Sequence, residues 1–246
     1  MRSFMRRNVT LRAVSEPLPL VLIPGLLDSA RLYAQQLPEL WRLGPVTVAD
    51  HTRDDSMAGI ARRILATAPP RFALAGLSMG GYIAFEILRQ TPGRIAKLAL
   101  LDTSARADTP EATAVRRTQM ALSISGRFAE VVEAQFVRLV SPARRDDAAL
   151  RETNRRMAED VGPEGFIRQQ TAIMGRPDSR PGLAAIACPT LVLVGEQDEL
   201  TPPERAAEMA QGIRAAQLVT VPECGHLSTL EQPRAVTQAL LDWLAG

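Results

Sequence analysis

The chain has 246 residues, 46% of them hydrophobic and 23% charged, which is the composition of an ordinary globular protein. Its formal net charge of +2 gives no reason to expect a nucleic acid or another polyanion as a partner. The two cysteines, Cys188 and Cys224, are too few for a disulfide framework and lack metal-ligand neighbours, so we expect free thiols. The apolar run at residues 18–27 contains two prolines and is too short to span a bilayer, so we expect a cytoplasmic protein.

The first hundred residues alternate between short apolar runs and amphipathic segments. We expect the apolar runs to be strands, at residues 18–23, 46–49, 72–75 and 95–101. We expect the amphipathic segments to be helices, at residues 32–41, 56–68 and 79–90. Residues 8–14 alternate loosely and are a candidate first strand. This alternation predicts an α/β fold with a mostly parallel sheet and helices on both faces.

The next eighty residues break the alternation. They are rich in Arg, Ala and Glu, contain no convincing strand, and are interrupted near Gly126, at 141–142, at 162–163 and at 176–177. Strands are expected again at 190–194 and 217–221, with helices at 203–211 and 231–244. We therefore divide the chain into a core of residues 1–103 and 184–246 and a helical insertion at 104–183 of three or four short helices.

A glycine-rich turn follows the strand expected at residues 72–75. It reads Gly76-Leu77-Ser78-Met79-Gly80-Gly81, and a helical pattern begins at once. A G-x-S-x-G spacing occurs often by chance, but a strand before it and a helix after it are the context of a nucleophilic serine on a sharp turn. The glycines permit the tight backbone that such a turn needs. Ser78 is therefore the candidate nucleophile.

A serine hydroxyl needs a base, and two histidines are available. His226 follows the last expected strand and His51 follows a short early one. Imidazole titrates near neutral pH, so either ring could take the serine proton. Active groups collect beyond the carboxyl ends of parallel strands, where both histidines are placed.

An acid is needed to orient the histidine. Asp198 follows the strand at 190–194 and is our candidate, because a carboxylate there could accept the second ring N–H. Its position just before a helix also suits a helix-capping aspartate. Glu196 and Asp102 compete with it, since each also follows a strand.

The order of Ser78, Asp198 and His226 along the chain, with the motifs around them, resembles the α/β-hydrolase superfamily. The chain is most similar to small bacterial carboxylesterases with a helical cap, in plan like the esterases that cleave pimeloyl-carrier-protein methyl ester. The likeness covers nearly the whole chain. It is strong at 76–81, 195–198 and 225–226 and weak across the insertion. It implies an α/β-hydrolase sheet, a Ser-Asp-His catalytic triad with His226 preferred over His51, and a cap formed by the insertion.

The resemblance also implies an oxyanion hole made by the backbone N–H groups of Leu26 and Met79, with Leu27 left open as the alternative to Leu26. Many relatives carry histidine before the first glycine of this loop, where this chain has Pro24. That departure removes a side chain and a backbone donor beside the hole. Cys224 is expected to pack or to line the pocket rather than to react.

The implied activity is hydrolysis of a small carboxylic ester through an acyl-enzyme on Ser78, with no cofactor and no metal. A small-molecule ester is then the expected partner, with neither nucleic acid nor membrane, in a monomer or small homo-oligomer. Thioester, lactone and C–C bond substrates stay open, because they share the same oxyanion chemistry. A lyase or synthase on the same fold also stays open.

Overall fold

The computed structural model describes residues 17–246, so the candidate strand at residues 8–14 lies outside the described part of the chain. Within that part, six parallel strands form one sheet in the order β2-β1-β3-β4-β5-β6. The strands are β1 (Leu20–Ile23), β2 (Val46–Val48), β3 (Phe72–Leu77), β4 (Ile95–Leu101), β5 (Thr190–Gly195) and β6 (Ala216–Val221). The predicted parallel α/β sheet is confirmed.

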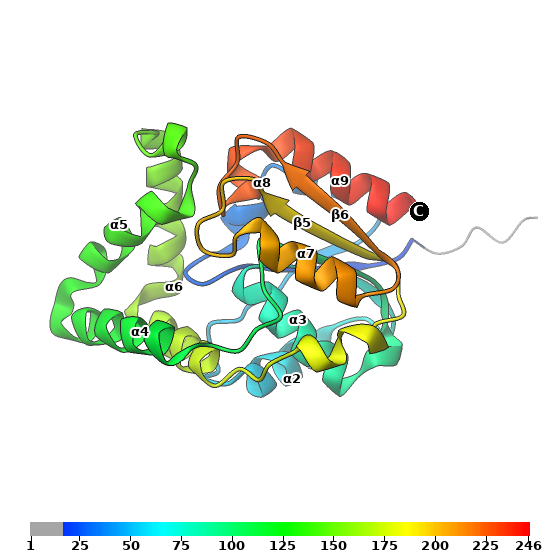
Figure 1. Cartoon of the computed structure of the whole chain (residues 1–246), viewed down its shortest axis with the longest axis horizontal. Helices are drawn as coiled ribbons and strands as arrows, with labels where there is room; N and C mark the ends of the chain where they lie inside the picture. Colours follow the sequence, from blue (N-terminus) through cyan, green and yellow to red (C-terminus); the bar gives the residue numbers. More distant parts are fainter. Residues whose placement is uncertain (1–16) are drawn as a thin grey trace, which may run out of the picture.

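Helices cover both faces of this sheet (Figure 1). One face packs against α2 (Met57–Thr67), α3 (Met79–Gln90) and α7 (Pro203–Gly212), and the other against α1 (Leu37–Leu40) and α9 (Pro233–Ala245). Every residue of β1, β3 and β5 is buried, because these strands have helices above and below. Burial on both faces explains why these strands read as continuous apolar runs in the sequence.

Between β4 and β5 the described chain contains only helices. These are α4 (Pro110–Leu122), α5 (Phe128–Leu139) and α6 (Ala148–Met174), and they pack on one another around Val131, Val132, Ala158 and Phe166. Figure 1 shows them as a layer beside the sheet, on the side toward which the arrowheads of β5 and β6 point. The insertion thus lies at the carboxyl ends of the strands.

Helix α6 is longer than the short helices expected in the insertion. The predicted break at residues 162–163 is a kink, where Gly162 has φ 72° and the helix resumes after it. Pro163 is tolerated because it opens the second half of the helix, where a missing N–H leaves no bond unmade.

Two other segments differ from expectation. The helical pattern at 32–41 is a 3₁₀ turn, η1 (Ala30–Tyr33), followed by the single turn α1, because Pro38 opens a new helical start. The helix expected from residue 231 is divided into α8 (Ser228–Glu231) and α9, which begins at Pro233. The remaining short turns are η2 (Pro92–Arg94), η3 (Ser123–Arg127), η4 (Pro142–Arg144) and η5 (Arg180–Ala185). None of the helices in residues 17–246 combines the length and apolarity needed to cross a bilayer.

Candidate active site

Ser78 occupies a strained turn between β3 and α3. Its backbone has φ 54° and ψ −114°, a conformation that residues other than glycine rarely adopt. The turn is held by neighbouring β4 and the loop after it, because the Ser78 N–H donates to the Leu101 carbonyl (2.9 Å) and Thr103 Oγ1 donates to the Ser78 carbonyl (2.7 Å). Strain kept in place by surrounding bonds is typical of a functional site.

Glycines make this turn possible by letting backbones touch. A Cβ on Gly76 would lie 2.3 Å from the carbonyl carbon of Gly80. A Cβ on Gly80 would lie 2.1 Å from the carbonyl oxygen of Ile23, at the end of β1. Both contacts are far too short for any side chain, so the motif's glycines bring the serine turn against the end of the neighbouring strand.

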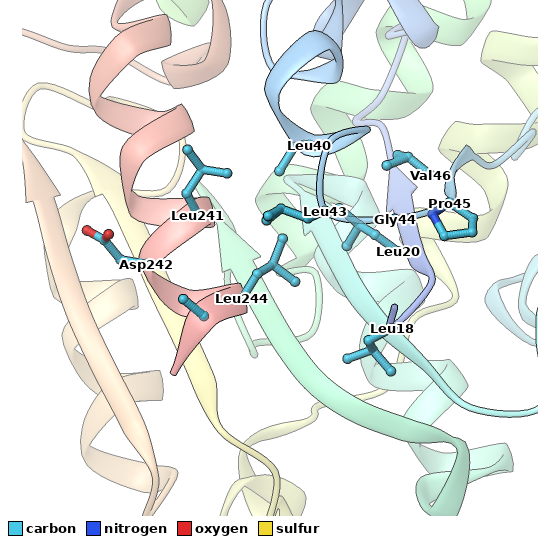
Figure 2. A pocket seen from close by; sticks show the side chains of 11 residues that line it. Leu18, Leu20, Leu40, Leu43, Gly44, Pro45, Val46, Leu241, Asp242 and Leu244 are labelled. Carbon is cyan, nitrogen blue, oxygen red and sulfur yellow. The ribbon is translucent and has the colours of Figure 1, made fainter. Parts of the chain in front are cut away.

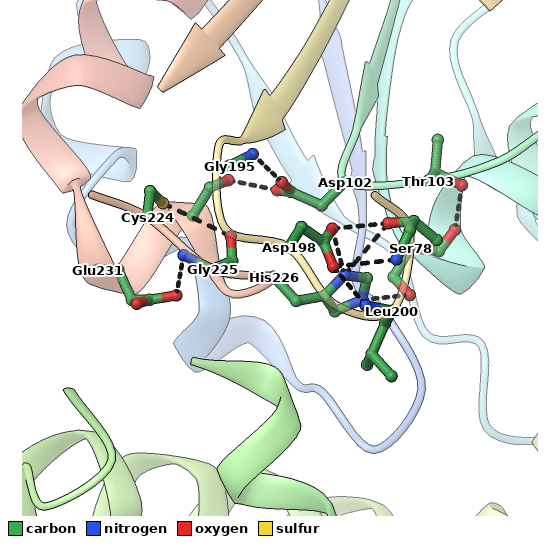
Figure 3. Close-up of polar contacts among 12 residues, drawn as sticks. Ser78, Asp102, Thr103, Gly195, Asp198, Leu200, Cys224, Gly225, His226 and Glu231 are labelled. Carbon is green, nitrogen blue, oxygen red and sulfur yellow. Dashed lines mark hydrogen bonds and ion pairs between the residues drawn. The ribbon is translucent and has the colours of Figure 1, made fainter. Parts of the chain in front are cut away.

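Three of the predicted residues are brought together at the ends of three strands (Figure 3). Nε2 of His226, after β6, lies 2.8 Å from Oγ of Ser78. Nδ1 of the same ring lies 2.8 Å from Oδ2 of Asp198, after β5. The sheet order places β3, β5 and β6 close enough for their following loops to meet. The result is one continuous hydrogen-bonded chain from carboxylate to hydroxyl.

Both oxygens of the Asp198 carboxylate have hydrogen-bond partners. Oδ1 accepts from the N–H groups of Leu200 (2.8 Å) and Thr201 (2.9 Å), and Oδ2 accepts from Thr201 Oγ1 (2.7 Å) as well as facing His226. Burial opposes ionisation, but the His226 charge and these donors outweigh it and hold the pKa of Asp198 below its usual value. Burial lowers the pKa of His226, but the adjacent Asp198 carboxylate outweighs it, so that pKa is raised above 6.5.

The competing residues are engaged elsewhere. Oε2 of the exposed Glu196 accepts only a long bond from the Glu223 N–H (3.4 Å). Asp102 accepts from the Gly195 N–H (2.8 Å) and from Ser228 Oγ, and burial together with the Asp198 charge raises the pKa of Asp102 to about 8. Neither carboxylate contacts His226, so the geometry favours Asp198 as its partner.

The loop after β1 is braced from outside. Leu27 has φ 62°, and its N–H donates to Oε1 of Gln169 on α6 (3.1 Å). In the described part of the chain the N–H groups of Leu26 and Met79 donate to no protein atom. Leu27 is therefore engaged, and Leu26 is the one that remains available to a ligand.

His51 and Tyr33 support the same loop where Pro24 lacks a donor. Nε2 of His51 lies 2.8 Å from the Gly25 carbonyl and 3.0 Å from Nε2 of Gln169, and Tyr33 Oη donates to the Ile23 carbonyl (2.9 Å). Burial lowers the pKa of His51, although its hydrogen bond with the Gly25 backbone opposes this, so the ring is neutral at pH 7. The second histidine thus contacts the loop and not the serine.

Sequence reasoning missed several residues that hold this site. Glu231 is buried and accepts from the N–H groups of Ser141 (2.7 Å) and Gly225 (3.0 Å), which ties the His226 loop to the insertion (Figure 3). Gln169 of the insertion likewise holds the loop that carries Leu27, and Thr201 holds Asp198 from within the same loop. For Thr201, the short spacing from Asp198 was an available signal. For Gln169 and Glu231 no local signal existed.

The serine opens into a cavity of about 430 Å³ between the sheet and the insertion. Its walls include Leu26, Asp28, Ser78, Tyr82 and His226 from the core and Glu111, Val115, Arg116, Gln119, Arg138, Leu139 and Ile173 from the helical layer. Another hollow, of about 420 Å³, lies at the opposite, amino ends of β1 and β2, beside α9 (Figure 2). Its lining is leucine-rich and carries none of the candidate catalytic residues.

No group of three or more His, Cys, Asp or Glu side chains able to hold a metal exists within residues 17–246. Cys188 is half-buried and Cys224 fully buried, and both are free thiols. Burial raises the pKa of both, so neither is an activated thiolate.

Fold and site together define an α/β-hydrolase. A sequence model of the alpha/beta hydrolase family matches residues 20–239, and the chain belongs to this family. It is therefore an enzyme of the α/β-hydrolase type.

Particular relatives are esterases and a lactonase. The chain is 33% identical to a solved thermophilic esterase from Thermogutta terrifontis, with a TM-score of 0.84 over 94% of this chain and 90% of that one. It is 26% identical to a pimeloyl-acyl-carrier-protein methyl ester esterase of Nitrosomonas europaea, over 81% of this chain and 83% of the relative. The enol-lactonase from Burkholderia xenovorans LB400 shares the fold, with a TM-score of 0.85 at 23% identity over 94% of this chain and 93% of that one.

Proposed function

We propose that this protein is a serine hydrolase that cleaves a small carboxylic ester through an acyl-enzyme on Ser78. The observation that carries the proposal is the chain of two 2.8 Å contacts from Ser78 through His226 to Asp198, opening into a cavity. No other buried arrangement of a hydroxyl, an imidazole and a carboxylate occurs within residues 17–246.

In the first half-reaction the Ser78 hydroxyl attacks the ester carbonyl carbon. His226 takes the hydroxyl proton on Nε2 as the bond to carbon forms, and then gives it to the departing alkoxide as the C–O bond breaks. Asp198 accepts the Nδ1–H, which fixes the tautomer that leaves Nε2 free to act as base. In the second half-reaction a water, deprotonated by His226, releases the acid and restores Ser78.

The negative charge on the carbonyl oxygen is stabilised by the N–H groups of Leu26 and Met79. Both are without protein partners in the described chain, whereas the Leu27 N–H is held by Gln169. The Met79 N–H also lies in the first turn of α3, where backbone donors have no partner within the helix. Preorganised donors of this kind are each worth about 10²–10³ in kcat.

The helices α4 to α6 act as the cap that shapes the substrate site. They supply Val115, Gln119, Arg138 and Leu139 to the cavity that contains Ser78. The esterase relatives support an ester, and a thioester, a lactone and a C–C bond stay as alternatives. Those alternatives share the same oxyanion chemistry and differ only in the fit to this cavity.

The test is turnover of p-nitrophenyl esters from acetyl to dodecanoyl by wild type, Ser78→Ala and His226→Ala. Turnover by wild type that is lost in both variants supports the proposal and ranks the acyl chains. Ser125→Ala, which removes an exposed serine of the insertion, is the matched control and should behave as wild type. Equal turnover by Ser78→Ala and wild type would contradict the proposal. A ligand bound tightly but turned over once would indicate a receptor or another non-hydrolytic use of the fold.

A further inference from the structure

One carboxylate in the catalytic cavity has no role in the mechanism above. Asp28 follows the loop that carries Leu26, and it lines the same cavity as Ser78 and His226. It is only 4% exposed, yet its carboxylate makes no hydrogen bond or ion pair with any side chain of the described residues. Its N–H donates to the Gly25 carbonyl (3.2 Å), and this bond closes the turn.

Asp28 and the nucleophile face the same small space. A Cβ placed on Gly25 would lie 2.5 Å from Oδ2 of Asp28 and 3.2 Å from Cβ of Ser78. The missing side chain of Gly25 is therefore what keeps the space between carboxylate and serine open. Oδ2 of Asp28 and Cβ of Ser78 both border this space.

The other buried carboxylates near the site are satisfied. Asp102 accepts from Gly195 N–H and Ser228 Oγ, and Glu231 accepts from two backbone N–H groups. Within residues 17–246 the Asp28 carboxylate has no partner beyond the Gly25 backbone. Burial raises its pKa to about 7, although the His226 charge and that backbone hydrogen bond oppose the shift. A buried carboxylate that can accept further hydrogen bonds at the cavity wall suits a ligand that carries a hydrogen-bond donor.

The charges around the cavity favour a neutral donor over a cationic one. Arg138 and Arg116 lie in the wall of the cavity, so the insertion already places positive charge there. Arg116 is paired with Asp108, whereas Arg138 has no ion pair among the described residues. Glu111 is the other carboxylate of the cavity lining, and it is exposed at the insertion.

We propose that Asp28 determines specificity by accepting a hydrogen bond from a hydroxyl group on the substrate, one or two carbons from the scissile carbonyl. The preferred substrates are then esters of short hydroxy acids. This inference rests on the ester hydrolysis proposed above. An unsubstituted ester would offer the Asp28 carboxylate no donor beyond the Gly25 backbone, and sites of this kind discriminate strongly against analogues that lack the donor.

The experiment compares methyl butanoate with both enantiomers of methyl 3-hydroxybutanoate, at pH 8, where Asp28 is ionised. The quantity measured is the ratio of kcat/KM for the better hydroxy ester to kcat/KM for the plain ester. We expect wild type to favour the hydroxy ester at least tenfold and Asp28→Leu to reduce that ratio at least tenfold. Asp28→Asn keeps the shape and one acceptor, so its ratio should fall between the two. Glu204→Gln, which removes an exposed carboxylate outside the cavity, should keep the wild-type ratio.

A ratio near one in wild type, or one that neither Asp28 variant changes, would overturn the inference. If Asp28→Leu fails to fold in a thermal unfolding assay, the Asp28→Asn ratio decides. The proposed function fails separately: if neither ester is hydrolysed by wild type, or hydrolysis persists in Ser78→Ala, ester hydrolysis at Ser78 is wrong and the role of Asp28 is wrong with it. Ser78-dependent hydrolysis with a ratio indifferent to Asp28 overturns only the specificity claim.

Discussion

Replacing Asp198 with asparagine tests the orientation of His226, because the structure dictates how the new amide would lie. Oδ1 of Asp198 accepts from two backbone N–H groups, those of Leu200 and Thr201. An asparagine must keep its carbonyl oxygen there, since an NH₂ group would face two donors. Its NH₂ would then take the place of Oδ2 and point at Nδ1 of His226, 2.8 Å away.

An amide donor at Nδ1 forces the ring into the wrong tautomer. Nδ1 becomes the acceptor, so the proton moves to Nε2, where it blocks removal of the Ser78 proton. The same substitution in another Ser-His-Asp enzyme lowers kcat by about 10⁴, so we expect a loss on the order of 10³–10⁴, or about 4–5 kcal/mol in activation free energy. KM should change little, because Asp198 does not line the cavity.

The assay is steady-state hydrolysis of the best p-nitrophenyl ester, with thermal unfolding to show that the variant is folded. Glu196→Gln is the matched control, because Glu196 lies in the same loop and accepts only one long backbone bond. We expect its kcat to match wild type. Near-normal turnover by Asp198→Asn would refute the reasoning and redirect attention to Asp102.

Three further predictions follow from the same contacts. In wild type, kcat/KM should rise with pH to an inflection above pH 6.5, because the pKa of His226 is raised. Asp198→Asn should move that inflection to lower pH. An inflection at or below pH 6.5 in wild type would argue against the pairing of Asp198 with His226. Gln169→Leu leaves the Leu27 N–H without a hydrogen-bond partner, so it should lower the free energy of unfolding by about 1–3 kcal/mol and also lower kcat. Unchanged values would show that the loop does not depend on its contact with α6. Asp28 has a pKa of about 7 in the folded protein against 3.8 in the unfolded chain, so the free energy of unfolding falls as pH rises from 4 to 7. In urea unfolding, Asp28→Asn should raise the free energy of unfolding by up to ~4 kcal/mol at pH 8 and by almost nothing at pH 4. An equal gain at both pH values would contradict the raised pKa.

The sheet could be predicted because its central strands β1, β3 and β5 are short and buried on both faces. Strand β3 is apolar or glycine at every position and is followed at once by Ser78, and β5 is apolar or glycine after Thr190. Ser78, Asp198 and His226 became candidates from local signals, a glycine turn and polar residues after strands, and the family resemblance then favoured His226 over His51. Parallel pairing then brings such ends to one edge of the sheet, so local reasoning was enough to place them together.

Contacts made by the insertion could not be predicted. Gln169 reaches Leu27 across 142 residues of sequence, and Glu231 reaches Ser141 across 90, so neither pairing leaves a periodic or local trace. The choice between Leu26 and Leu27 depended on the Gln169 contact, which only the packing of α6 supplies. The break expected at Gly162 and Pro163 is a kink, since the second half of α6 still has a buried face to place against the core.

The central claim is that Ser78 becomes acylated. Its most direct test is intact-protein mass spectrometry after treatment with a fluorophosphonate and, separately, after rapid acid quenching during turnover of a p-nitrophenyl ester. We predict one adduct per chain in both experiments, mapped to the peptide that contains Ser78 and absent from Ser78→Ala. Rapid ester turnover with no fluorophosphonate adduct, or an adduct that persists in Ser78→Ala, would contradict the account.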